Sequence, residues 1–380
     1  MLRQIIKRRG VAILDGGMGT ALEQRGIEEP WSAGYRLDEP TVRKAVLDSY
    51  GSFLQAGADL LTVNTYNLST PALANDFFSS GGDSSVLSQR RDALLKAAGD
   101  GGAKAAVANM FRANVEVART AVAAHMAETT ADGGGPLRVE PLLVASMGCY
   151  GTCIRGRAET ANREGEAGAD DAALLREPAY GRVSKDALVA FHTERVALAL
   201  ANGVRLLAFE TVPDLVEAEA IAEVMQATTG GAEAEVEAWV TFTCGTSDRV
   251  DNGALFDDCV AALNGVHSIV GVGINCTAPH LVVPLLDIAA AAQLPEHPKI
   301  LVCYPNSGET YLARALQEGE TEHWKFCNHD HHAESAEGAV FADDAAAWYA
   351  AGARVIGGCC RVTAADIAQL SAKYPPLLSE

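Results

Sequence analysis

Three cysteines that follow apolar, strand-like segments are the residues of this sequence best suited to chemistry. Cys276 ends one such segment, and the adjacent Cys359 and Cys360 follow another that runs into Gly357-Gly358. An apolar run that meets two glycines is typical of a buried strand that ends where another backbone or a ligand comes close. Adjacent cysteines are poor disulfide partners for each other, whereas thiolates are zinc ligands. The alternative is that they are small core residues, because free cysteine is often buried.

The chemistry that three such thiolates would support is the activation of another thiol. Cys276, Cys359 and Cys360 would form a three-ligand zinc site with one open position, which is the arrangement of a catalytic site. Three sulfur ligands leave zinc a weak Lewis acid for water but a good partner for a further thiolate. Because zinc lowers the pKa of a coordinated thiol, the substrate would become a nucleophile at neutral pH.

Two carboxylates and two glycines suggest how a substrate would be held. Asp15 and Glu210 each follow an apolar run, so both are expected to be partly desolvated and able to bind an ammonium group. The alternative for either residue is a loop cap or a structural salt bridge. Gly16 and Gly17 offer backbone N–H groups for a carboxylate. An amino acid with a thiol, such as homocysteine or cysteine, would satisfy all of these features.

The elements that must position these residues follow an alternating pattern. Short apolar runs alternate with alanine-rich segments of helical period, including the predicted helices 41–56, 184–202 and 363–373, which indicates βαβ units and a parallel sheet. Eight strands with following helices predict a (β/α)8 TIM barrel; the alternative, an open doubly wound sheet, lacks support because no Gly-x-Gly-x-x-Gly follows a strand. The predicted strands are 11–15, 59–64, 142–146, 205–210, 237–243, 268–275, 300–304 and 353–357.

A barrel brings the ends of these strands to one face. Active sites of such barrels lie at the carboxyl ends of the strands. Strands six and eight are separated by one strand, so Cys276 is expected within side-chain reach of Cys359 and Cys360. The polar residues expected at the same face are Asp15, Asn64-Thr65, Glu210, Asn275 and Asn306.

Other cysteines and histidines have weaker signals. The second candidate metal group, Cys327, His329, His331 and His332, lacks the Cys-x2-Cys spacing of strong zinc motifs, and a solvated loop is the preferred interpretation of the His-rich segment 323–332. Cys149 and Cys153 form a weak Cys-x3-Cys pattern. The remaining ones are interpreted as residues satisfied within the fold: Cys244, Cys259, Cys303, His192 and His267.

Composition limits the class of protein. The 380 residues are expected to form one domain, 1–380, with long loops after strands three (155–178) and seven (308–338). A net charge of −19 argues against nucleic acid or an anionic membrane as partner. No apolar run is long enough to span a bilayer. Nine scattered cysteines do not form a disulfide framework. The basic start runs directly into a predicted strand, unlike a cleaved transit peptide, so a cytoplasmic protein is expected.

Taken together, the motifs resemble those of the homocysteine S-methyltransferases, a family of zinc-dependent (β/α)8 barrels. The resemblance extends over nearly the whole chain. The segments that carry it are Leu14-Asp15-Gly16-Gly17-Met18-Gly19-Thr20, Gly57-Ala58-Asp59 with Asn64-Thr65-Tyr66, Ser146-Met147-Gly148-Cys149-Tyr150-Gly151, Phe209-Glu210-Thr211-Val212-Pro213, Asn275-Cys276, Tyr304-Pro305-Asn306-Ser307-Gly308-Glu309 and Gly357-Gly358-Cys359-Cys360.

The resemblance implies roles for individual residues. It assigns one zinc ion to Cys276, Cys359 and Cys360, and homocysteine to Asp15 and Glu210 with Gly16, Gly17 and Asn275 in the substrate site. Asn67 resembles by position a residue of the methyl-donor pocket, although glutamine is the residue expected in the S-methylmethionine-using branch. Two further departures are Cys149, where proline is usual, and a long acidic segment at 155–178.

The activity implied is methyl transfer from a sulfonium donor to homocysteine, which forms methionine. S-Methylmethionine is the first expectation for the donor and S-adenosylmethionine the second, because the sequence lacks the folate- and cobalamin-binding modules and the long C-terminal arm of other branches. The alternatives are a selenocysteine or selenohomocysteine methyltransferase, an enzyme with a betaine-type donor, and a zinc- or thiol-binding protein without turnover.

Overall fold

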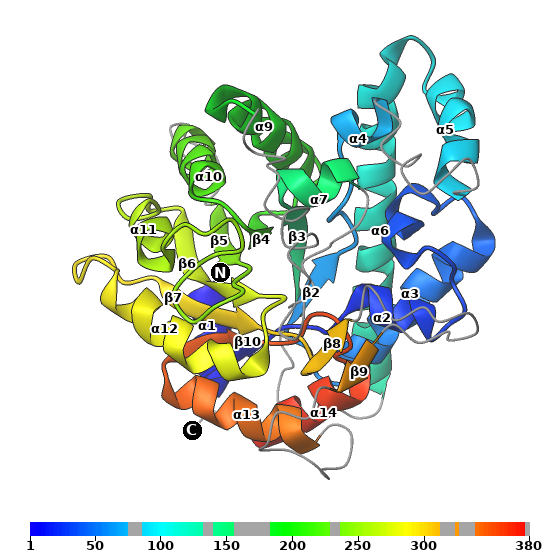
Figure 1. Cartoon of the computed structure of the whole chain (residues 1–380). Coiled ribbons are helices and arrows are strands. Elements are labelled where there is room, and N and C mark those ends of the chain that lie inside the picture. Colours follow the sequence, from blue (N-terminus) through cyan, green and yellow to red (C-terminus); the bar gives the residue numbers. More distant parts are fainter. Residues whose placement is uncertain are drawn as a thin grey trace.

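Eight parallel strands form a barrel in the computed structural model (Figure 1). The structure describes residues 1–74, 86–131, 140–155, 183–228, 236–311, 324–326 and 339–376. The sheet order is β1-β10-β7-β6-β5-β4-β3-β2, and a parallel bridge between Leu14 and Leu60 links its two ends. The strands are β1 (Ala12–Ile13), β2 (Leu60–Val63), β3 (Leu142–Gly148), β4 (Leu206–Val212), β5 (Glu237–Phe242), β6 (Ile269–Asn275), β7 (Ile300–Tyr304) and β10 (Ala353–Ile356). The predicted (β/α)8 fold and its eight strands are confirmed.

Helices surround the barrel, and the predicted ones lie within a residue or two of their expected bounds. The Ser184 side chain caps α9 by accepting a hydrogen bond from the Ala187 N–H at 3.2 Å, as the sequence predicts. The helices are α2 (Met18–Glu23), η1 (Pro30–Tyr35), α3 (Pro40–Gln55), α4 (Thr70–Ala74), α5 (Val86–Ala97), η3 (Gly99–Gly101), α6 (Gly102–Ala131), α7 (Tyr150–Arg155), α9 (Lys185–Ala201), α10 (Leu215–Thr228), α11 (Phe256–Ala261), η4 (Pro279–Leu281), α12 (Val282–Ala291), α13 (Ala339–Ala350) and α14 (Ala364–Lys373).

The helix at the start of the chain and a pair of short strands were not predicted. The basic start forms α1 (Leu2–Arg9), and the backbone N–H of Leu2 and the N-terminal ammonium of Met1 each contact the Glu237 carboxylate at 2.8 Å. Because Glu237 begins β5, these contacts place the start of α1 at the end of the barrel opposite the strand tips. The segment 308–338, predicted as a loop, contains an antiparallel pair, β8 (Glu309–Tyr311) and β9 (Trp324–Phe326).

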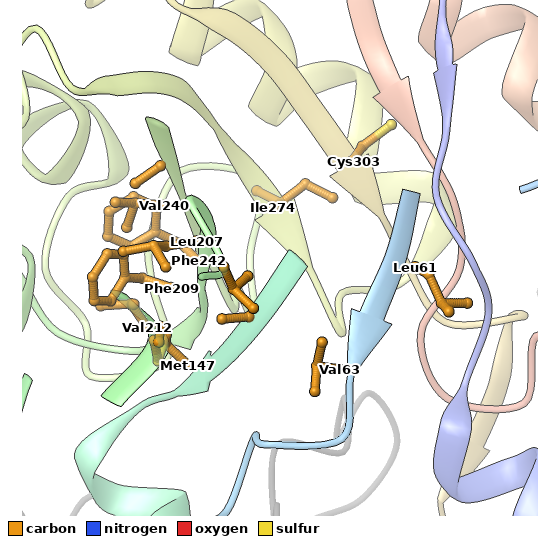
Figure 2. Close-up of a cluster of buried hydrophobic side chains, with 14 of the residues drawn as sticks. Leu61, Val63, Met147, Leu207, Phe209, Val212, Val240, Phe242, Ile274 and Cys303 are labelled. Atoms are coloured by element: carbon orange, nitrogen blue, oxygen red, sulfur yellow. The ribbon is translucent and has the colours of Figure 1, made fainter. Parts of the chain in front are cut away.

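Successive side chains along each strand point alternately outward and inward, and they form two buried layers. Outward-facing side chains pack between the strands and the helices, and Figure 2 shows Leu61, Met147, Phe209 and Cys303 in this layer. Cys303 is therefore a core residue, as predicted. The inward-facing layer includes Leu60, Val144, Ala208, Trp239 and Val302. Since strand side chains repeat every two residues, Thr62, Ser146, Glu210 and Tyr304 continue the inward rows toward the strand ends.

Gly273 shows how close two strands of this barrel come. A Cβ atom at this position would overlap the backbone of Val302 on the neighbouring β7. We therefore expect Gly273→Ala to lower the free energy of unfolding by about 3 kcal/mol, because the backbone has to move. The midpoint of urea denaturation measures this change. Gly51→Ala is the control: it lies within α3 with open space around it and should be about 1 kcal/mol more stable than the wild type. Equal stability of the two variants would contradict the close approach at Gly273.

Among the described residues, no helix is long and apolar enough to cross a membrane.

Candidate active site

The three predicted cysteines meet at the carboxyl ends of β6 and β10. Their sulfur atoms all lie within 4.8 Å of one another, and they are the one group of potential metal ligands among the residues that the structure describes. The arrangement follows from the sheet order, because β7 alone separates β6 from β10. The sulfur atoms of Cys359 and Cys360 are 4.0 Å apart and not bonded. The predicted meeting of these remote cysteines is confirmed.

Cys276 and Cys359 are joined by a disulfide in this structure, which the sequence did not predict. The bond and a metal are alternatives, because a metal needs both sulfurs as thiolates. The residues themselves fit a metal. Two thiolates on a tetrahedral zinc ion lie about 3.8 Å apart, close to the 4.0 Å between the sulfurs of Cys359 and Cys360.

Glycines let other backbones approach the cysteine pair. A Cβ atom at Gly357 would lie 2.6 Å from the Leu14 Cβ, and one at Gly17 would lie 2.5 Å from the Cys359 carbonyl oxygen. The Gly17 N–H donates to the Val362 carbonyl at 3.0 Å. Gly17 is therefore needed for close packing, and the predicted use of its N–H for a substrate carboxylate does not fit this arrangement. Gly16 also packs closely, since its Cβ would meet the Val362 carbonyl oxygen at 2.7 Å.

Asp15 lies just past β1 and is 2% exposed. Its carboxylate accepts hydrogen bonds from the N–H and the hydroxyl of Thr62, both at 2.8 Å. Burial raises the pKa of Asp15 to about 7, although these hydrogen bonds act in the opposite direction. Its oxygen atoms are thus oriented by β2, and the described residues offer it no ion pair or helix to cap.

Glu210 lies near the end of β4 and is 8% exposed. One carboxylate oxygen accepts a hydrogen bond from the Ser146 hydroxyl at 3.1 Å, and the other, Oε1, is buried without a partner among the described residues. Burial raises the pKa of Glu210 to about 8; the Ser146 hydroxyl lowers it, the nearby Asp15 carboxylate raises it, and the charge of Arg195 and the Tyr304 hydroxyl lower it. A buried carboxylate oxygen without a donor is costly, so it marks where a cationic ligand would be stabilised.

Two predicted site residues have structural contacts. The Asn275 side chain accepts from the Thr211 N–H at 2.7 Å and donates to the Thr211 hydroxyl at 2.8 Å. These bonds hold Thr211 at a positive φ of 60° directly after Glu210. The Asn67 side chain donates to the Trp31 carbonyl at 3.0 Å, and the backbone carbonyl of Asn67 accepts from the Tyr35 hydroxyl at 2.5 Å. Both asparagines thus orient the segments around them.

Further polar atoms lie at the same end of the barrel. Asn64 Nδ2, after β2, and Asn306 Oδ1, after β7, are buried without partners in the described part of the chain. Both asparagines were among the polar residues expected at the strand ends. Together with Glu210 Oε1 they make this end suited to a polar ligand.

Some functional residues were missed by the sequence analysis. Thr62, which orients Asp15, carries no motif beyond its inward position on a strand, and Ser146, which orients Glu210, was named only within a family motif and without a role of its own. Arg195, in the middle of α9, is 1% exposed and donates to carbonyl groups at the carboxyl ends of β2 and β3. His192 was expected to be satisfied in the fold, and it forms a buried pair with Glu217 at 2.8 Å. No sequence pattern distinguishes Arg195 from a surface arginine.

Among the described residues, none of the weaker candidates belongs to the cysteine group. Cys149, Cys153, Cys244 and Cys259 are buried free cysteines. The His-rich segment 323–332 falls outside the described residues apart from 324–326, and so does the segment 155–178 apart from residue 155.

The chain is similar to known proteins over nearly its whole length. The family model for homocysteine S-methyltransferase matches residues 12–374. The homocysteine S-methyltransferase of Escherichia coli is 34% identical over 98% of both chains, and homocysteine S-methyltransferase 1 of Arabidopsis thaliana is 30% identical over 98% of this chain and 96% of its own.

Solved structures are similar as well. The homocysteine methyltransferase MmuM of E. coli in its metallated form covers 98% of this chain and 99% of its own, with 28% identity and a TM-score of 0.67; its oxidised form has 29% identity, the same coverage and the same TM-score. The fold, the converging cysteines and these comparisons lead to one conclusion: the chain belongs to the homocysteine S-methyltransferase family.

Proposed function

We propose that this enzyme transfers a methyl group from a sulfonium donor, S-methylmethionine first and S-adenosylmethionine second, to the sulfur of L-homocysteine, forming methionine. The observation that carries the proposal is the convergence of three thiols and an unpartnered buried carboxylate oxygen at one end of the barrel. The E. coli relative is named for homocysteine, and the similar MmuM of E. coli was solved in a metallated form.

Zinc is the metal that best suits the three sulfur ligands Cys276, Cys359 and Cys360. When bound, zinc lowers the pKa of a coordinated thiol and so supplies a nucleophilic sulfur at neutral pH. The fit rests on the separation of the sulfurs and on the absence of any nitrogen or oxygen ligand from this group. The metallated form of E. coli MmuM supports a metal at this site but does not name the metal.

The carboxylates bind and orient the acceptor. Glu210 Oε1 accepts a hydrogen bond from the homocysteine ammonium group, and Asp15, fixed by Thr62, adds negative charge nearby. A cation at this site favours the ionised form of both carboxylates. Because burial raises the pKa of Asp15 to about 7 and that of Glu210 to about 8, binding of the cation displaces a proton from Glu210. The barrel holds the acceptor sulfur in line with the donor methyl group, which is an effect of proximity.

The reaction needs no general base at the methyl carbon. The acceptor sulfur forms a bond to the methyl carbon while the donor's C–S bond breaks, and the bonding electrons stay with the donor sulfur, which becomes a neutral thioether. The acceptor thiol releases its proton to solvent before the transfer. Asn275 and Asn67 keep the surrounding segments in place through their contacts with Thr211 and Trp31.

The deciding experiment is a panel of methyl donors with homocysteine: S-methylmethionine, S-adenosylmethionine, betaine and a methylated folate. We expect methionine formation with the sulfonium donors, because a sulfonium carries a good leaving group. Of the two sulfonium donors, S-methylmethionine should give the higher kcat/KM. Highest turnover with betaine or folate would overturn the choice of donor. Binding of zinc and homocysteine without methionine formation from any donor would establish the non-enzyme alternative.

A second acceptor has support from one observation. The selenocysteine methyltransferase of Astragalus bisulcatus is 28% identical over 93% of this chain and 89% of its own. Selenocysteine and selenohomocysteine offer the same ammonium group to Glu210 and a softer chalcogen to the metal. Kinetics with homocysteine and both seleno amino acids, at equal donor concentration, separate the two readings by their kcat/KM ratios.

We propose further that residues 1–380 form one homocysteine-binding barrel domain, a proposal supported by the family match over residues 12–374. We place the enzyme in the cytoplasm, because its scattered thiols suit a reducing compartment. Its acidic charge suits small-molecule partners rather than nucleic acid.

A further inference from the structure

Arg195 is a buried cation with no acidic partner in the part of the chain that the structure describes. Its side chain is 1% exposed, and no carboxylate of the described residues forms an ion pair with it. Instead, the guanidinium donates to the carbonyl oxygens of Gly148 at 2.5 Å, Tyr66 at 2.7 Å and Thr65 at 3.3 Å. Its carbon also lies 5.0 Å from the centre of the Phe191 ring. A buried arginine without a carboxylate is expensive compared with an apolar residue of similar volume, so stability alone does not explain it.

The three carbonyl groups belong to the strand ends that form the site. Thr65 and Tyr66 follow β2, and Gly148 is the last residue of β3. A planar guanidinium bonds two such groups at fixed angles, unlike the compact ammonium of lysine. Arg195 therefore ties the ends of β2 and β3 together from the outer side of the barrel.

Two short connections lead from these groups to Glu210. The Thr65 hydroxyl donates to the Ser146 carbonyl at 2.8 Å, and the Ser146 hydroxyl donates to Glu210 at 3.1 Å. Gly148 is also the register partner of Glu210 in the β3–β4 pairing. The positive charge of Arg195 lowers the pKa of Glu210 and so partly offsets the effect of burial. The hydrogen bonds of Arg195 and its positive charge thus both act on the Glu210 carboxylate.

We propose that Arg195 is a positioning residue for the acceptor amino acid: by holding the ends of β2 and β3 it fixes Ser146, and through Ser146 it aims Glu210 at the substrate ammonium group. The inference rests on the proposed function, in which Glu210 binds that group. It assigns to a helix residue outside the barrel a part in the choice of acceptor.

The experiment compares two acceptors, homocysteine and its desamino analogue 4-sulfanylbutanoate, which lacks the ammonium group. The quantity measured is the ratio of their kcat/KM values, because a general loss of folded or metal-loaded enzyme cancels in this ratio. We expect Arg195→Met to lower the preference for homocysteine about tenfold, the effect of losing a well-placed charged hydrogen bond. A preference within twofold of the wild type in folded Arg195→Met would overturn the inference.

Arg195→Lys keeps the charge but not the planar fork, and it should lower the preference about threefold. If Arg195→Met does not fold, this variant decides: an unchanged preference would overturn the inference. Arg119→Met is the matched control, because Arg119 donates to the Asn202 carbonyl at 2.6 Å on the exposed side of α6. Its preference should equal that of the wild type.

Glu210→Gln separates failure of this inference from failure of the proposed function. If Glu210→Gln keeps the wild-type preference, Glu210 does not bind the ammonium group and the proposed function loses its acceptor site. If Glu210→Gln loses the preference while folded Arg195→Met keeps it, only the role of Arg195 is rejected.

Discussion

Cys359→Ala is expected to lower methyl transfer to homocysteine by at least about 10³-fold, because the acceptor thiol is no longer activated. Cys359 is the middle sulfur of the group: it contacts Cys360 at 4.0 Å and is joined to Cys276. Its loss leaves two sulfur ligands, too few for a stable zinc site. Elemental analysis should find much less zinc per chain than in the wild type.

The fold should survive this substitution. Cys359 is only partly buried and follows β10 in a segment held by backbone hydrogen bonds, including the one from its own N–H to the Pro305 carbonyl at 2.8 Å. We expect the free energy of unfolding of the metal-free, reduced protein to change by less than about 1 kcal/mol. Cys259→Ala is the control: this cysteine is buried in α11, away from the site, and its loss should leave zinc content and turnover intact. Full turnover in Cys359→Ala would reject thiol activation by the metal.

The sequence was sufficient to predict the barrel and the meeting of the cysteines, for a physical reason. Alternating strand and helix patterns are local, and once eight βα units are recognised the order of strands in a closed barrel follows from chain order. In that order β7 lies between β6 and β10. Cys276, Cys359 and Cys360 needed no further information than their positions at strand ends.

Contacts that depend on packing in three dimensions could not be predicted in this way. The N–H of Gly17 is used by Val362, far along the chain, so a glycine that looked like an anion site serves close packing. The helix α1 depends on Glu237, in β5, for a partner to its first N–H groups. Arg195 looks in the sequence like any charged residue of an amphipathic helix; only the position of the carbonyl groups at the ends of β2 and β3 explains why it is buried.

Glu210→Gln is the second substitution with a large expected effect, a loss of about 10²-fold in kcat/KM for homocysteine. The reason is that a neutral amide cannot balance the charge of a buried ammonium group, and truncating or neutralising one partner of a buried charge pair costs several kcal/mol. The same change should increase the stability of the ligand-free protein at alkaline pH. Opposite effects on function and stability are the signature of a strained site residue.

The sign of the stability effect follows from the raised pKa of Glu210, which burial moves from 4.5 to about 8. Between these values the unfolded chain has lost its proton while the folded chain keeps it, so the wild type loses stability as pH rises from about 4.5 to about 8. Above pH 8 the carboxylate is ionised in both states and the whole penalty, on the order of a few kcal/mol, is present. Glutamine has no such penalty, so denaturation midpoints of Glu210→Gln should fall less steeply over this range.

Binding provides the matching measurement. Below pH 8 homocysteine must displace a proton from Glu210, so calorimetry in buffers of different ionisation enthalpy should show that Glu210→Gln releases fewer protons than the wild type on binding. Glu219→Gln is the control, since Glu219 is an exposed residue of α10 near Lys185. It should match the wild type in stability, affinity and proton release. If Glu210→Gln bound homocysteine with wild-type affinity and proton release, the carboxylate with the unpartnered oxygen would have no part in holding the acceptor, and the ammonium group would have to lie elsewhere in the barrel mouth.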